Sequence, residues 1–188
     1  MLKIGDVDVK NLARFENMLG ALGTDAPKAM NSAINRTGSM ARTQVIRSLS
    51  KQTGLPQKTI RKAIKVKRSS WDDLRYSLSA SGGDVSLKYF KPHETRKGVT
   101  AFVRGQRQLY ENSFMKGGSF SRGRVALNMG GHVFQRIGPE RLGIEKLKSG
   151  VVIPAEMVDG ASAAVFEETV TEHLPRRLDH EIGRLLGL

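Results

Sequence analysis

The chain has 188 residues, 39% hydrophobic and 26% charged, which is typical of a globular protein with one well-buried core or two small ones. It contains no cysteine, which excludes disulfide frameworks and thiolate metal sites, and no apolar run approaches the roughly 20 residues of a membrane span. Its 31 Lys and Arg against 18 Asp and Glu give a net charge of +13, which favours nucleic acid or a strongly acidic protein surface as partner.

The amino-terminal residues carry no apolar signal core, so we expect a cytosolic product that is neither exported by a standard signal nor anchored to a membrane.

The first part of the chain is predicted to be helical. Apolar residues at helical spacing predict a short amphipathic helix over 9–22. Thr24 and Asp25 then offer N-cap oxygens, and a continuous apolar stripe predicts a second helix of about seven turns ending at Gly54. Pro56 opens a third, basic helix over 56–64.

The middle of the chain is β-rich. Alternating residues between Gly-rich breaks predict an antiparallel meander of four or five strands, at 74–80, 85–90, 99–104, 124–129 and 132–137. Residues 128–131 are predicted to form a hairpin turn. Residues 104–124 are rich in Gly, Ser and basic side chains, which predicts a long mobile loop of the functional kind. The alternative is a solvated arm with no partner.

From about Pro154 the chain is predicted to be helical again, and Pro175 is expected to kink or split that helix. The predicted fold class is α+β, with N-terminal helices including one long helix, a central antiparallel sheet of four to five strands with a long basic loop, and a C-terminal helix. We expect a single domain over 1–188, divided into a helical basic part (1–70), a β-rich part with a loop arm at 104–124 (71–140), and a connecting loop with the C-terminal helix (141–188).

No motif predicts catalysis, a metal or a cofactor. The four histidines include no pair at the i, i+4 spacing of two ligands on one helical face, and they are expected to lie at the surface or to be satisfied: His93, His132, His173 and His180. Glu167, Glu168 and Glu172 are expected to form a solvated acidic face with helical charge pairs. The glycine clusters lack the spacing of phosphate-binding loops, and no G-x-S-x-G elbow occurs. The protein is therefore predicted not to be an enzyme and to need no cofactor.

The positive charge is concentrated. Residues 26–71 contain eleven Lys or Arg and no acid, 85–139 contain ten against two acids, and acids lead nine to six over 140–188. The first run predicts contact with a phosphate backbone, or alternatively a solvated face that balances acidic neighbours in an assembly, and the two interpretations stay open. The candidate nucleic-acid-facing residues are Arg36, Arg42, Arg47, Lys51, Lys58, Arg61, Lys62, Lys65, Lys67 and Arg68. Residues 46–65 are also typical of a helix-turn-helix DNA reader, which is the alternative function.

Three segments of the chain resemble, in the family's order, the minor tail protein Z family of long-tailed phages and prophages. They are AINRTGSMARTQVIRSLSKQTGLPQKTIRKAI (33–64), GGHVFQRIGPERLGIEKLKSGVVIPAEM (130–157) and LPRRLDHEIGRLL (174–186). Lambda's tail completion protein is the namesake of this family, and the neck proteins of similar phages look related to it.

The resemblance implies a structural morphogenesis protein of the virion tail or neck, assembled in the bacterial host cytoplasm and needed to join tails to DNA-filled heads. The implied partners are copies of itself in a ring, with a hexamer expected, together with tail terminator or tail tube proteins, head-connector proteins and double-stranded DNA without sequence preference. No membrane partner is expected. The candidate assembly contacts are Arg107, Tyr110, Phe114, Phe120, Arg122, Arg124, Phe134, Arg136, Ile144, Glu145 and Lys146.

Overall fold

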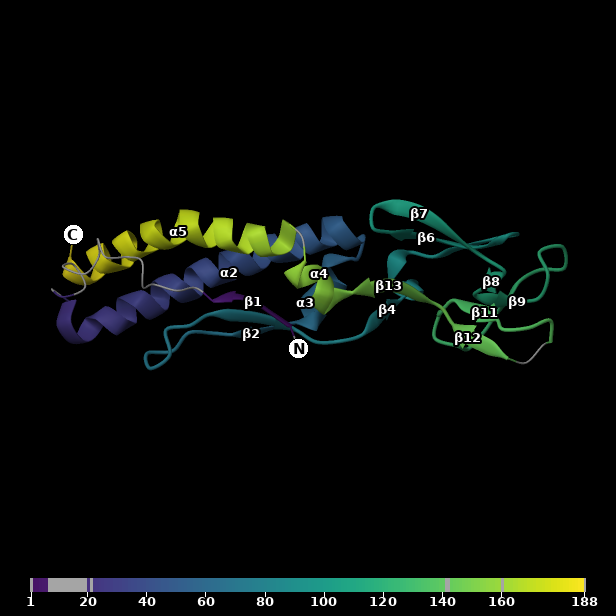
Figure 1. Cartoon of the computed structure of the whole chain (residues 1–188), viewed down its shortest axis with the longest axis horizontal. Helices are drawn as coiled ribbons and strands as arrows, with labels where there is room; N and C mark the ends of the chain where they lie inside the picture. The colour runs from purple at the N-terminus through teal and green to yellow at the C-terminus, as the bar shows by residue number, and fades with distance from the viewer. Residues whose placement is uncertain (1, 7–19, 21, 141–142, 160, 188) are drawn as a thin grey trace.

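The structure is a computed structural model that describes residues 2–6, 20, 22–140, 143–159 and 161–187. The molecule is elongated, with its long helices toward one end and small sheets toward the other (Figure 1). Its class is α+β, as predicted. The helix predicted over 9–22 lies outside the described residues, except for residues 20 and 22.

The helical segments are two long helices and several short ones. In chain order they are the 3-10 segment η2 (Gly23–Asp25), α2 (Ala26–Thr53), α3 (Gln57–Ala63), the 3-10 segment η3 (Leu87–Phe90), α4 (Ile153–Val158) and α5 (Ala161–Leu186). The strands are β1 (Leu2–Asp6), β2 (Ile64–Lys67), β3 (Ser77–Ala80), β4 (Asp84–Ser86), β5 (His93–Thr95), β6 (Gly98–Val103), β7 (Gln106–Glu111), β8 (Ser113–Phe114), β9 (Lys116–Gly117), β10 (Val125–Ala126), β11 (Phe134–Arg136), β12 (Ile144–Lys146) and β13 (Lys148–Val152).

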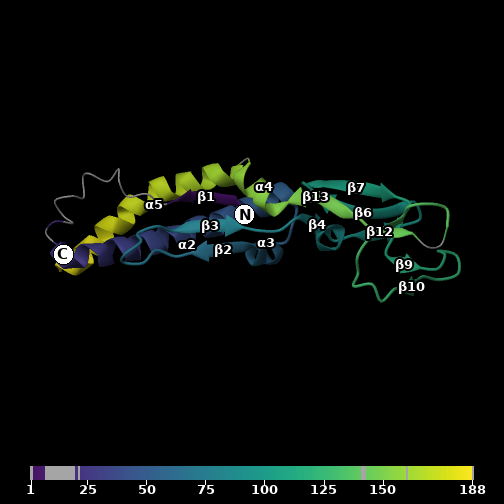
Figure 2. The same cartoon turned by 60° about the horizontal axis from the view of Figure 1, so that its bottom comes forward.

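Helix α2 has the predicted position and length. It ends at Gly54, whose backbone φ of +80° lies in the left-handed region that glycine adopts without steric penalty. A Cβ at this position would also lie 2.8 Å from the carbonyl oxygen of Phe102. The buried stripe of α2 includes Ala33 and Ala41, and such small side chains permit close packing against α5, which runs beside α2 in both views (Figures 1 and 2).

The second long helix, α5, runs through Pro175 without a break. The predicted split at Pro175 is therefore wrong, and the interruption lies instead between α4 and α5. A proline removes one helical hydrogen bond, but Leu174 and Leu178 on either side of it are buried in the core. Tertiary packing of these leucines stabilises the helix across the missing bond.

A three-stranded antiparallel sheet with the order β1-β3-β2 lies along the helix pair (Figure 1). Its central strand, β3, is buried at all four positions. Just before β3, the ring of Tyr76 is buried against Gly38 of α2, at a place where a Cβ would approach ring carbons to 2.4 Å. Glycine at this helix position therefore lets the tyrosine side chain pack against the α2 backbone.

The β-rich end consists of several small antiparallel sheets, and the prediction of one sheet with four to five strands is wrong in this respect. These sheets have the orders β5-β6-β7, β13-β4, β12-β11-β8 and β10-β9. Residues 128–131 do form a turn, but β10 before it pairs with β9, and β11 after it pairs with β8 and β12. Strands of two or three residues make too few ladder bonds to extend into one continuous sheet.

About half of the segment predicted as a long loop, 104–124, forms strands. It contains β7, β8 and β9, and β7 pairs with β6 along its whole length. The turn of this hairpin is Arg104-Gly105, with φ values of +50° and +77°, the signs that a two-residue type I′ turn requires. Because β7 is exposed at five of its six positions, its sequence shows no alternation of apolar and polar residues. Without this alternation, the sequence of β7 predicts a loop.

Candidate functional site

The candidate nucleic-acid-facing residues lie on three consecutive elements of the fold. Nine of the ten candidate nucleic-acid-facing residues are exposed, on α2, α3, β2 and the residue that follows β2: Arg36, Arg47, Lys51, Lys58, Arg61, Lys62, Lys65, Lys67 and Arg68. Within the described part of the chain, only Lys67 among these nine has an ion-pair partner, Asp73 at 2.7 Å. The other eight side chains are exposed and form no ion pair with another described residue.

Arg42 differs from the rest of this set. It is half-buried, and its Nε has no hydrogen-bond partner among the described residues. It lies near Tyr76, whose pKa is raised by burial, while a hydrogen bond with Ser39 and the charges of Arg42 and Arg68 act in the opposite direction. Arg42 is thus engaged in the packing around Tyr76, and reversing its charge would disturb the fold.

Two hollows at the carboxyl end of α2 concentrate the positive charge. One, of about 550 Å³, is bordered by Arg47 and Lys51 together with Val165 at the start of α5. The other, of about 410 Å³, is bordered by Lys51, Lys91 and Arg107, and no acidic residue lines either hollow. The fold therefore brings two candidate nucleic-acid contacts, Arg47 and Lys51, close to the candidate assembly contact Arg107.

A third hollow, of about 520 Å³, is bordered by Lys58 and Lys62 of α3 together with Asp84 and Tyr89. Asp84 is already engaged, because its Oδ1 accepts hydrogen bonds from the backbone N–H of Gly150 at 2.9 Å and from that of Ser149 at 3.2 Å. Sequence reasoning missed Lys91 and Tyr89, since isolated residues in a β-rich region carry no local signal.

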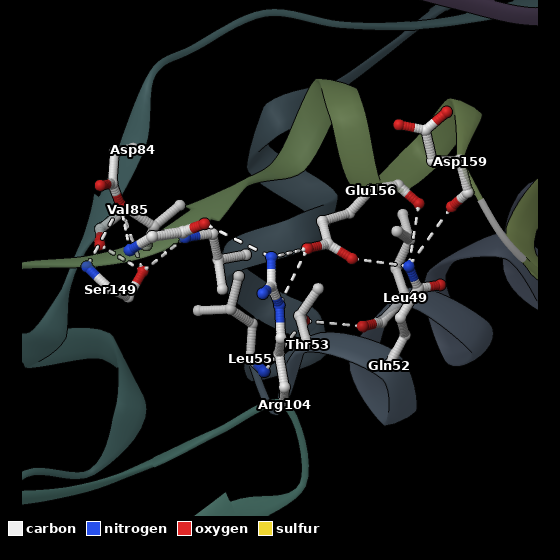
Figure 3. A network of polar contacts seen from close by, with 12 residues as sticks. Leu49, Gln52, Thr53, Leu55, Asp84, Val85, Arg104, Ser149, Glu156 and Asp159 are labelled. Carbon is white, nitrogen blue, oxygen red and sulfur yellow. Dashed lines mark hydrogen bonds and ion pairs between the residues drawn. The ribbon is translucent and has the colours of Figure 1, made fainter. Parts of the chain in front are cut away.

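A polar junction fixes the β6–β7 hairpin against the helices (Figure 3). Arg104 Nη2 lies 2.7 Å from Glu156 Oε1, and Gln52 Nε2 donates to Glu156 Oε2 at 2.6 Å. The backbone N–H of Arg104 donates to the carbonyl of Thr53 at 2.9 Å. The sequence did not predict this junction, because Arg104 and Glu156 are separated by 52 residues and lie in unrelated patterns. It sets the position of the basic hollows relative to the β-rich end.

The candidate assembly contacts divide into two groups. Four are half-buried and hold the β-rich end together, namely Tyr110, Phe114, Arg124 and Phe134. The rings of Phe114 and Phe134 lie 6.3 Å apart, and Arg124 forms an ion pair with the largely buried Glu94. The other seven are exposed: Arg107, Phe120, Arg122, Arg136, Ile144, Glu145 and Lys146. Only the second group presents its side chains to a partner.

The geometry of residues 46–65 differs from that of a DNA-reading helix-turn-helix. Helix α3 has seven residues, roughly two turns, and it leads directly into strand β2. Its buried residue Ile60 and the following Ile64 attach it to the core. A recognition helix enters the major groove with its own long exposed face, and α3 offers only a short one.

Unpaired exposed cations and exposed apolar side chains are features of a protein that acts by contact with other macromolecules. The chain matches the family described as Prophage minor tail protein Z (GPZ) over residues 9–188, and it belongs to that family. Comparison with curated proteins and with solved structures finds no significant match.

Membership in this family confirms the resemblance seen in the sequence. The protein is a structural phage tail protein and not an enzyme, with a role in tail morphogenesis. Among the described residues, no helix has the length and apolarity needed to cross a membrane.

Proposed function

We propose that this protein completes the head-proximal end of the tail and enables tails to join DNA-filled heads, as a ring, with a hexamer expected. The basic surface of α2, α3 and β2 lies near the DNA in the channel. Its neighbours along the particle axis are the tail terminator or tail tube proteins on one side and the head-connector proteins on the other. The single observation that carries this proposal is the surface of eight exposed cations that have no ion-pair partner among the described residues.

The arrangement of these cations suits a DNA backbone. Arg36 and Arg47 are eleven residues apart on α2, which places them on the same side of the helix and roughly 16 Å apart along it. Lys51 follows one turn later, and Lys58 and Arg61 continue the charge on α3. Lys and Arg that neutralise phosphates release counterions, so the attraction is independent of sequence and sensitive to salt. A ring repeats this surface around its axis and multiplies the effect.

The joining role is tested by electron microscopy of lysates from a producing strain that lacks the gene, with and without complementation. The deletion strain should yield filled heads and free tails of normal length, and complementation should restore whole virions. Intact virions in the deletion strain would refute the joining role.

The DNA-facing surface is tested separately, by complementation with Arg47→Glu plus Lys51→Glu. We expect fewer whole virions, because two cations bordering the hollows at the end of α2 become anions. The matched control is Arg96→Glu plus Lys97→Glu, which changes the net charge equally at exposed positions away from α2 and α3. Equal numbers of virions from both variants would refute the DNA contact of Arg47 and Lys51, and they would not contradict the joining role.

Duplex binding in solution gives a second measurement of the same surface. If Arg47 and Lys51 each neutralise one phosphate, replacing both with Gln should reduce the slope of log affinity against log salt by about 1.8. An unchanged slope would place the DNA contact elsewhere on the molecule.

A further inference from the structure

The β-rich end exposes large apolar side chains next to cations. Phe120 is 43% exposed, Val125 65%, Ile137 72% and Ile144 37%. Lys116 and Arg122 are exposed in the same β9–β10 region as Phe120 and Val125. We call these six residues the tip patch, because β9–β10 and β11–β12 lie at the same end of the molecule in both views (Figures 1 and 2). Apolar side chains combined with arginine are typical of protein interfaces, and phosphates give such apolar groups no favourable contact.

The opposite chemistry occurs on the first half of α5. Residues 161–175 contain no Lys or Arg, and Glu167, Glu168 and Glu172 are all exposed. In the described part of the chain, Glu167 and Glu168 have no ion-pair partner, and Glu172 has only long contacts, the nearer being Arg176 at 3.8 Å. We call these three carboxylates the acidic patch. Two copies with a net charge of +13 repel each other overall, and the acidic patch is a place where a basic surface of a second copy is attracted instead.

We propose that the tip patch of one copy docks on the acidic patch of the next copy, head to tail. The proposal rests on the proposed function, since it supplies the subunit contact of the ring. The two patches are separated along the long axis of the molecule (Figure 1), so the contact joins different surfaces of two copies. A heterologous contact of this kind closes into a ring when its rotation allows.

In this contact the charged residues and the apolar residues have different roles. The cations Lys116 and Arg122 meet Glu167 and Glu168, which steers the encounter and fixes the orientation of the two copies. The apolar side chains Val125 and Ile137 leave water on contact, and this burial contributes most of the affinity. Alanines at the exposed positions 161 and 164 of α5 leave room for these larger side chains.

The test is a charge exchange, measured by sedimentation velocity and mass photometry of the full chain over a range of concentrations. Lys116→Glu plus Arg122→Glu should weaken self-association at least tenfold, and so should Glu167→Lys plus Glu168→Lys. Mixing the two variants should restore assembly, because each supplies the complement that the other has lost. Ile137→Asp should also weaken assembly, without restoration by either charge variant.

Arg96→Glu plus Lys97→Glu is the matched control, since it reverses two charges at exposed residues of the turn between β5 and β6, outside both patches, and should leave self-association unchanged. Thermal unfolding of every variant checks that the fold is kept. Unchanged assembly in both charge variants, failure of the mixture to restore it, or a wild-type chain that stays monomeric at every concentration would overturn this interface. The joining assay on the deletion strain is independent of these outcomes, so failure of the interface is distinguishable from failure of the proposed function.

Discussion

The two ends of this molecule are built in different ways. In the helical half, the two long helices and strands β2 and β3 share an apolar core with many fully buried side chains, among them Ile34, Leu49 and Leu178. At the β-rich end, strands of two to six residues form separate sheets, connected in part by polar groups such as the Arg124–Glu94 ion pair. Small sheets gain little stability by themselves, so side-chain contacts between them matter more.

This difference separates the part of the protein that is stabilised by buried side chains from the part that exposes apolar side chains to a partner. The helical half is stable through burial, which leaves its outer face free to carry charge. The β-rich end leaves large apolar side chains exposed, as at Val125 and Ile137, and such exposure lowers the burial that a lone copy achieves. Four predictions test this contrast.

The largest effect is expected from Leu178→Ala in the helical half. This side chain is fully buried, and truncation of a buried leucine should lower the free energy of unfolding by about 3 kcal/mol, measured by chemical denaturation. The matched change at the β-rich end is Ile137→Ala, at a side chain that is 72% exposed, and it should alter stability by less than about 0.5 kcal/mol. Equal losses at the two sites would contradict the contrast between the two ends.

Gly38→Ala should have the next largest effect. The added Cβ would lie 2.4 Å from ring carbons of Tyr76, and this ring is only 1% exposed and has no space into which to move. Overpacking costs about 1–3 kcal/mol, and an approach of 2.4 Å to a buried ring puts this site at the upper end of that range. Alanine in a helix regains up to about 1 kcal/mol, so the net loss should be about 2 kcal/mol. Gly83→Ala is the control, because its Cβ would meet open space. A neutral Gly38→Ala would show that Tyr76 is loosely held.

Breaking the junction between the two ends should cost less. Arg104→Asn keeps a residue that tolerates the left-handed turn and removes the contact with Glu156. Since the Arg104 side chain is more than half exposed, solvent screening limits the loss to about 1 kcal/mol or less. Hydrogen exchange should report faster opening of the β6–β7 hairpin and no change in α2. Arg107→Asn, at an exposed position of the same hairpin, serves as the control, and equal acceleration there would refute the role of the junction.

The smallest effect concerns the pH dependence of the β-rich end. Burial, with the charges of Lys146 and Lys88, lowers the pKa of His132 below its ordinary value of about 6.5. Its Nδ1 lies 2.8 Å from Ser86 Oγ, and Lys88 Nζ donates to its Nε2 at 3.2 Å, which suits a neutral ring.

Because the folded chain binds this proton more weakly than the unfolded chain, the stability from His132 is present above about pH 6.5 and is lost as the pH falls below that value. Thermal unfolding at pH 7.5 and 5.5 should therefore show a smaller decrease for His132→Gln than for the wild type. A decrease that is identical in the two proteins would show that His132 makes no contribution.

The sequence by itself determined helix α2, the α+β class and the family. An apolar stripe of helical spacing and a glycine stop define α2, because a helix of that length is fixed by local hydrogen bonds and by one buried face. The acid-free run that ends at Trp71 also appears in the structure as exposed cations, since Lys and Arg without partners remain in water.

Only the tertiary structure decided the arrangement of the β-rich end. Strand pairing there depends on partners far away in the chain, so the composition of 104–124 suggested a loop where β7 pairs with β6. The continuity of α5 through Pro175, the burial of Arg42 and the meeting of Arg104 with Glu156 likewise depend on neighbours from distant segments. Local patterns report local hydrogen bonding and burial, and they carry no record of which distant surfaces come together.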